Sequence, residues 1–147
     1  MTDILDFKPE HMIGIEKDDP DTNILLFCGD LDKKAEYYAK AGPAITLMDE
    51  DKLLALGGVI KFWPGVGEAW MLVSPDGRNK WISVYRYMSA FLMSCFVKHG
   101  FHRIQASILD SNMIAHKCAF KLGFIPEGMM VHYGPRKENF VRYVRFS

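Results

Sequence analysis

Residues 73–83 are Val-Ser-Pro-Asp-Gly-Arg-Asn-Lys-Trp-Ile-Ser, and they separate a predicted strand from a long predicted helix. The strand covers residues 68–73. The helix covers residues 81–99, where apolar side chains recur at three- and four-residue steps, as in an amphipathic helix that ends at Gly100. Because main-chain amides at a helix start lack intrahelical partners, such a junction can bind an anion. The junction is therefore the centre of an expected α/β fold.

The other predicted elements extend one sheet on both sides of this junction. Short turns separate strands over residues 44–48, 52–62 and 68–73, which favours an antiparallel meander. The pair Gly57-Gly58 predicts a bulge or a close main-chain approach in the second strand. Asp30 or Asp32 is expected to cap a helix ending at residue 40, and Gly123 to end a helix over residues 113–122 in a left-handed conformation. Further expectations are strands at 4–7, 103–108, 124–133 and 140–146, a helix at 10–16, a polar break at 18–23 and a turn at 63–67. A single mixed α/β sheet follows from this order.

The composition is typical of one folded domain in the cytoplasm. The chain has 147 residues, 49% of them hydrophobic and 24% charged. Its 18 basic and 18 acidic residues cancel, which argues against nucleic-acid binding. No apolar run reaches the roughly 20 residues of a membrane span, and the first residues do not resemble a signal peptide. Cys28, Cys95 and Cys118 predict reduced thiols, and the five histidines have no metal-ligand spacing, so we expect no metal site.

Two motifs give a resemblance to a known family. The first is V-x-P-x-x-R-G-K-G-I-G, matched in register by Val73, Pro75, Arg78, Lys80 and Ile82. The second is N-x-x-A-x-x-x-x-x-x-L-G-F, matched by Asn112, Ala115, Leu122, Gly123 and Phe124. On these residues, and on the order of its elements, the chain resembles the GCN5-related N-acetyltransferases (GNAT proteins). The resemblance implies one GNAT-like domain over residues 1–147, a mixed α/β (α+β) sheet with splayed central strands and helices on both faces.

The resemblance also implies a binding site for acetyl-CoA. Its pantetheine arm would pair with the main chain of Met71, Leu72 and Val73, and its diphosphate would lie on the amides that begin the following helix. The three loop glycines of the motif are replaced here by Asn79, Trp81 and Ser83. Trp81 either anchors the core or stacks on a ligand, and its bulk predicts weakened coenzyme binding. The implied cofactor-binding residues are Met71, Leu72, Val73, Arg78, Asn79, Lys80, Trp81, Ile82, Ser83 and Asn112.

Candidate catalytic residues are few. The resemblance implies a proton-donating tyrosine seven residues after Asn112, but Ala119 stands there. Glu68 is a candidate general base, directly or through water, against the alternative of a solvated strand-end carboxylate. Tyr133 and His132, expected on the hairpin beside the acceptor cleft, are candidates for proton transfer against a packing role.

Three further side chains have a structural expectation. We expect His116 to face solvent and Cys95 to lie in the core. Cys118 could be a nucleophile only with a base beside it, and the sequence places none there.

Two functional hypotheses remain open from the sequence. One is an acetyl-CoA-dependent N-acetyltransferase for a small amine or a protein amino group, with weak or absent activity as the leading form and full activity as the alternative. The other is a non-enzymatic GNAT-fold protein. The opening Phe7-Lys-Pro-Glu-His and the glycine-poor loop are similar to small GNAT-like proteins of short-tailed bacteriophages, including an internal virion protein family. That resemblance implies a phage or host protein partner and a location in the virion or host cytoplasm. An aromatic patch of Phe62, Trp63 and Trp70 is consistent with a homodimer.

Overall fold

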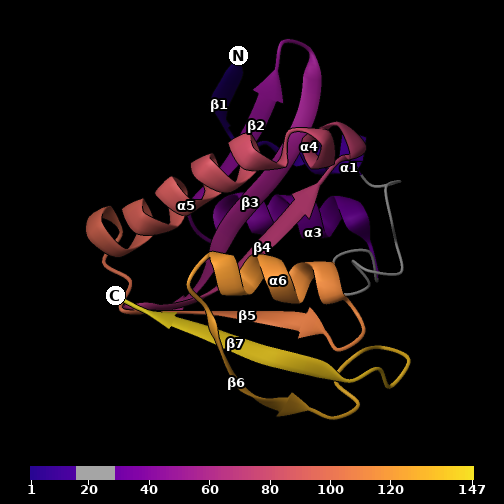
Figure 1. Ribbon diagram of the computed structural model, residues 1–147, viewed down its shortest axis with the longest axis vertical. Helices are drawn as coiled ribbons and strands as arrows, with labels where there is room; N and C mark the ends of the chain where they lie inside the picture. Colours follow the sequence, from indigo (N-terminus) through magenta and orange to yellow (C-terminus); the bar gives the residue numbers. More distant parts are fainter. Residues whose placement is uncertain (16–28) are drawn as a thin grey trace.

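A mixed sheet of seven strands forms the centre of the computed structural model, which describes residues 1–15 and 29–147 (Figure 1). The strand order is β1-β2-β3-β4-β5-β7-β6, and neighbouring strands are antiparallel except for the parallel pair β4 and β5. The strands are β1 (Thr2–Asp6), β2 (Ala44–Asp49), β3 (Lys52–Trp63), β4 (Val66–Val73), β5 (Arg103–Leu109), β6 (Ile125–Met130) and β7 (Phe140–Phe146). The described helices are α1 (Pro9–Ile15), α3 (Leu31–Lys40), α4 (Pro75–Asn79), α5 (Trp81–Lys98) and α6 (Met113–Lys121). The predicted α/β class is confirmed.

Helices cover both faces of the sheet, as expected. In Figure 1, α5 and α6 lie in front of the strands and α1 and α3 lie behind them. Behind the sheet, Met12 of α1 is fully buried in a cluster with Leu72 of β4. In front of it, Leu92 of α5 packs in a second cluster with Ile104 of β5. Each cluster removes apolar surface from water, so both layers are held to the sheet by burial.

Strands β4 and β5 form a fork. They pair only where Val66 faces Arg103, Gly67 faces Ile104 and Glu68 faces Gln105. Both strands continue beyond that point, β4 to Val73 and β5 to Leu109, without pairing to each other. The other edge of β4 stays paired with β3 as far as Val73. The splayed central strands predicted from the sequence are therefore present, and the fork opens at Glu68.

The junction after β4 contains a short helix that the sequence analysis did not predict. Ser74 caps α4 by accepting a hydrogen bond from the amide of Gly77 (3.0 Å), and its hydroxyl donates to the carbonyl of Leu53 on β3 (2.5 Å). A Cβ at Gly77 would lie 2.0 Å from the carbonyl oxygen of Leu54, so only glycine fits there. Helix α5 begins two residues after α4 ends, which replaces the expected loop with two nearly continuous helices.

The glycine pair of β3 shows which of its two expected roles applies. The strand is continuous through Gly57 and Gly58, and its irregularities lie elsewhere, near Leu47 of β2 and Lys61 of β3. A Cβ at Gly57 would lie 2.8 Å from the Sδ atom of Met88 on α5. A Cβ at Gly58 would lie 2.8 Å from Nε1 of Trp70. Close packing on both faces, and not a bulge, therefore requires the two glycines.

Other local expectations have mixed outcomes. Asp30, and not Asp32, caps α3, and Gly123 has the predicted left-handed conformation with φ 90°. Strand β4 starts at Val66, two residues early, because the turn before it is shorter than expected. Trp70 does not belong to an exposed patch: it packs beside Phe7, with ring centroids 5.2 Å apart.

Part of the sequence-based expectations falls outside the described residues. These are the last residue of the first helix, the polar break at 18–23, and Cys28. In the part of the chain that the structure covers, no helix is both long and apolar enough to cross a membrane.

Candidate active site at the fork of β4 and β5

A cavity of about 210 Å³ lies at the fork. Its lining includes Glu68, Ala69, Trp70 and Met71 of β4, together with residues of the outer half of β5 and of helices α5 and α6. Most of the lining side chains are apolar, and the polar ones include Glu68, Ser107 and Asn112. An apolar pocket with a few convergent polar groups is the usual form of a small-molecule site.

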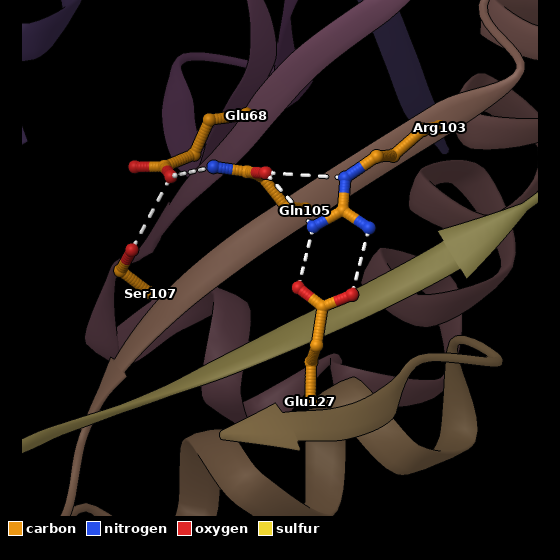
Figure 2. Close-up of polar contacts among 5 residues, drawn as sticks. All are labelled: Glu68, Arg103, Gln105, Ser107 and Glu127. Carbon is orange, nitrogen blue, oxygen red and sulfur yellow. Dashed lines mark hydrogen bonds and ion pairs between the residues drawn. The ribbon is translucent and has the colours of Figure 1, made fainter. Parts of the chain in front are cut away.

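The Glu68 carboxylate is held at the point where the strands separate (Figure 2). Its Oε1 atom accepts hydrogen bonds from the Gln105 side-chain amide (3.1 Å) and from the Ser107 hydroxyl (3.2 Å). All three side chains lie on one face of the sheet because Glu68 faces Gln105 in the register and Ser107 follows two residues later. Glu68 is half-buried and lines the cavity, so it is accessible to a ligand there.

An ion pair supports this group from the side of β6. Arg103 donates to both carboxylate oxygens of Glu127, at 2.8 and 2.5 Å, and to Oε1 of Gln105 through Nε (3.3 Å) and Nη2 (3.2 Å). Figure 2 shows the resulting chain of contacts from β6 across β5 to β4. The hydrogen bonds from Arg103 lower the pKa of Glu127, and those same bonds raise the pKa of Arg103.

Asn112 has the structural role expected of a residue before a helix. Its side-chain oxygen accepts from the amide of Ala115 (3.2 Å), which caps α6. Asn112 also lines the cavity, as does Ala119 at the position where the resemblance implies a tyrosine. The α6 wall therefore presents a methyl group, and no hydroxyl, at that position.

The main chain of β4 beyond Glu68 has one paired and one unpaired edge, and a pantetheine arm along it stays a prediction. Residues Met71, Leu72 and Val73 pair with β3 along one edge and have no register with β5 along the other. The Met71 side chain lines the cavity, while Leu72 is buried on the opposite face of the sheet. The unpaired edge can accept hydrogen bonds from an extended ligand, as exposed strand edges generally do.

The predicted diphosphate-binding residues lie apart from the fork cavity. A second surface hollow is lined by Arg78, Asn79, Lys80, Trp81, Ile82 and Ser83, with Asp49 and Met1, and it shares no lining residue with the cavity. The Lys80 ammonium forms an ion pair with Asp49, and the amino group of Met1 binds the other Asp49 oxygen at 3.1 Å. Lys80 is thus engaged with a carboxylate of the protein.

Trp81 packs as a core residue. It is half-buried against two apolar clusters, and its ring centroid lies 6.5 Å from that of Tyr85. Ile82 beside it is 74% exposed. Of the two roles expected for Trp81, the packing role is the one for which the structure shows contacts.

Tyr133 is not among the residues that line the cavity. It packs edge-on against Phe140, a lining residue, with ring centroids 5.5 Å apart, and is itself exposed. The neighbouring His132 has a left-handed backbone with φ 57°, and its amide donates to the side chain of Asn139 (3.0 Å). A proton-transfer role for either residue stays a prediction.

The expectation for His116 is wrong. Its Nδ1 atom lies 2.7 Å from the Tyr143 hydroxyl and its Nε2 atom 2.9 Å from the carbonyl oxygen of Asp110. The ring is half-buried because α6 places it over Tyr143 of β7. Both nitrogens are engaged, so His116 joins α6 to the sheet and does not face solvent.

Neither described cysteine is activated. Burial raises the pKa of Cys95 to about 12 and that of Cys118 to about 11. Both thiols are therefore protonated near neutral pH, and Cys118, although it lines the cavity, lacks the thiolate that a nucleophile needs. In residues 1–15 and 29–147, no group of three or more acidic, histidine or cysteine side chains could hold a metal ion.

The residues around Glu68 were not predicted from the sequence. Arg103, Gln105 and Ser107 alternate with Ile104 and other apolar residues along the predicted strand, so a polar strand face was visible. Nothing in the sequence, however, specified that this face adjoins Glu68, because the register of β4 with β5 joins segments separated by a whole helix.

Comparison with known proteins shows which solved structures share this fold. No family model matches the sequence, and no curated protein matches it. Among solved structures, spermidine N-acetyltransferase from Vibrio cholerae, in complex with CoA and spermine, is similar with a TM-score of 0.75 and 17% identity, over 99% of this chain and 95% of that one. Ribosomal-protein-S5-alanine acetyltransferase from Vibrio fischeri is similar with a TM-score of 0.73 and 16% identity, over 99% and 92%. The chain has the fold of the GNAT acetyltransferases.

Proposed function

We propose that the chain is an acetyl-CoA-dependent N-acetyltransferase that acts on an amine and binds its coenzyme weakly. The observation that supports the proposal is the fork itself, which combines an unpaired β4 edge, a cavity of about 210 Å³ and the Glu68 carboxylate. One solved structure of the same fold holds CoA and an amine together. In our proposal, both bind at the corresponding fork of this chain.

Glu68 is the proposed proton acceptor. Bound acetyl-CoA would supply the acetyl group as a thioester. An amine is protonated in water near neutral pH, and its nitrogen attacks only after losing a proton. In our proposal, Glu68 takes that proton. No tyrosine stands at Ala119 to protonate the leaving thiolate, so water would supply that proton. A missing general acid slows transfer without preventing it, since acid–base assistance typically contributes about 10²–10⁴-fold.

The residues at the start of α5 are the reason to expect weak coenzyme binding. The open β4 edge fits the pantetheine arm, but Lys80 is paired with Asp49 and Trp81 stands at the position of a motif glycine. The residues present therefore fit the arm better than the diphosphate. We expect a dissociation constant for acetyl-CoA above roughly 100 μM, or less than about 5.5 kcal/mol of binding free energy.

Isothermal titration with acetyl-CoA, combined with an assay of thiol release in the presence of polyamines, amino acids and amine-bearing peptides, tests the proposal. Glu68→Gln keeps the shape of the side chain and should lower kcat by about 10²–10⁴-fold. Glu36→Gln, an exposed position on α3, makes the same charge change away from the cavity and should leave kcat unchanged. If no amine leads to release of the coenzyme thiol and no binding of acetyl-CoA is detected, the non-enzymatic hypothesis replaces the proposed enzyme.

A further inference from the structure

We propose that Arg103 and Gln105 are positioning residues that hold the Glu68 carboxylate in a single orientation, with Glu127 as their anchor. The inference rests on the proposed function, because it assigns a purpose to a carboxylate that takes a proton. It adds three residues that do not touch the acceptor, on strands β5 and β6, to the machinery of the site.

The Arg103 guanidinium is fixed from several directions. Glu127 binds it through two hydrogen bonds of 2.8 and 2.5 Å, a bidentate geometry that sets the plane of the group. The Phe146 ring lies 6.0 Å from the guanidinium carbon. The remaining edge, Nε and Nη2, faces Oε1 of Gln105 at 3.3 and 3.2 Å. Arg103 therefore presents two N–H donors, in a fixed direction, to the side-chain oxygen of Gln105.

Those donors decide the orientation of the Gln105 amide. The oxygen and the NH₂ group of a glutamine side-chain amide have nearly the same shape, and only hydrogen bonding distinguishes them. With its oxygen toward Arg103, the amide must direct Nε2 toward Glu68, which it reaches at 3.1 Å. The reversed orientation would place NH₂ against a cation and oxygen against a carboxylate. Gln105 is only 6% exposed, so water cannot compensate for that reversal.

The result is an asymmetric carboxylate at the fork. Gln105 and Ser107 both donate to Oε1 of Glu68. Oε2 has no hydrogen-bond partner among residues 1–15 and 29–147, and Figure 2 shows it directed away from the donors. The Oε1 lone pairs are thus engaged, and Oε2 is the oxygen that receives the amine proton. The ion pair on β5 and β6 selects, through Gln105, which oxygen is free.

A double-mutant cycle tests whether Arg103 acts through Gln105. Arg103→Met and Gln105→Leu should each lower kcat by about 10- to 100-fold, the range for a catalytic group displaced by about 1 Å, without changing the KM for acetyl-CoA. The double variant should be no slower than Gln105→Leu alone, because residues in one network are not additive. Arg136→Met, which removes an exposed arginine paired with Glu138, is the matched control and should leave kcat unchanged.

A second readout does not depend on turnover. In ¹⁵N-labelled wild-type protein, the two Gln105 side-chain protons should give separate, slowly exchanging signals, because one of them is bound to Glu68. Arg103→Met should shift and broaden that pair and leave the side-chain amide signals of the asparagines in place. Arg103→Lys, which keeps the charge but not the fork of donors, should restore kcat only in part.

The outcomes separate the two proposals. A wild type that turns over an amine, with Arg103→Met at full kcat or with additive losses in the double variant, overturns the positioning role and leaves the proposed function standing. A Gln105 amide signal unchanged by Arg103→Met overturns it as well. A wild type without turnover on any amine refutes the proposed function, and with it a catalytic purpose for the network.

Discussion

Replacing Asp49 by asparagine should strengthen coenzyme binding. The Asp49 carboxylate, 11% exposed, pairs with Lys80, whose side chain is 51% exposed. In the proposed complex, Lys80 must exchange this partner for a phosphate, and Asp49 remains nearby as a repelling charge. A partly exposed ion pair contributes about 0.2–1 kcal/mol. Removing the competitor should therefore return up to about 1 kcal/mol to binding, which corresponds to a two- to fivefold lower dissociation constant.

The assay is isothermal titration with acetyl-CoA at low and high salt. Asp51→Asn, an exposed carboxylate in the same β2–β3 turn, is the matched control for net charge. The gain from Asp49→Asn over this control should shrink near 1 M salt, where the screening length is about 3 Å. If Asp49→Asn binds acetyl-CoA no more tightly than Asp51→Asn, Lys80 does not contact the phosphates and the placement of the diphosphate is wrong.

Three further predictions concern stability and reactivity. Gly77→Ala should lower the free energy of unfolding in urea by about 1–3 kcal/mol, because the new Cβ meets the Leu54 carbonyl. Gly128→Ala, whose Cβ would have nothing within 4 Å, is the control and should change it by less than about 0.5 kcal/mol. Burial lowers the pKa of His11. The stability that His11 contributes is therefore present above its ordinary pKa of 6.5 and is lost as the pH falls below that value. The urea midpoint should drop between about pH 7 and 5, and it should drop less in His11→Asn. In a Cys28→Ser background, alkylation at about pH 8 should be roughly 100-fold slower at Cys118 than at a thiol with the ordinary pKa of 9.0, and alkylation at the rate of an exposed thiol would contradict its burial.

The sequence predicted the fold well wherever its signal was local. Apolar spacing located α5 to within one residue, and the cap at Asp30 and the left-handed Gly123 follow from rules that involve only a few neighbouring residues. Helix α4 was missed because it is five residues long, too short for any periodic pattern. Its formation depends on Ser74 and Gly77 meeting the main chain of β3, a contact between distant segments.

The candidate site was predictable only where its signal was local. Glu68 and Asn112 stand out because each lies at the end of a predicted element. The partners of Glu68 do not, since Gln105 and Ser107 become its neighbours only through the parallel register of β4 with β5. The ion pair of Lys80 with Asp49 is equally non-local, and a basic residue in a phosphate-binding motif gave no sign that a carboxylate already held it.

The two ends of the site depart from the motif in different ways, and this difference has a physical basis. At the fork, the features that matter are a strand register and an unpaired main-chain edge, which many side chains can support. At the start of α5, the motif depends on glycines that let a phosphate approach the main chain, and each of those positions now bears a side chain. Replacing both Trp81 and Ser83 by glycine should therefore strengthen acetyl-CoA binding more than it changes kcat. A double variant that lowers kcat at saturating coenzyme while leaving the dissociation constant unchanged would show that the indole supports the fork and does not obstruct the phosphates.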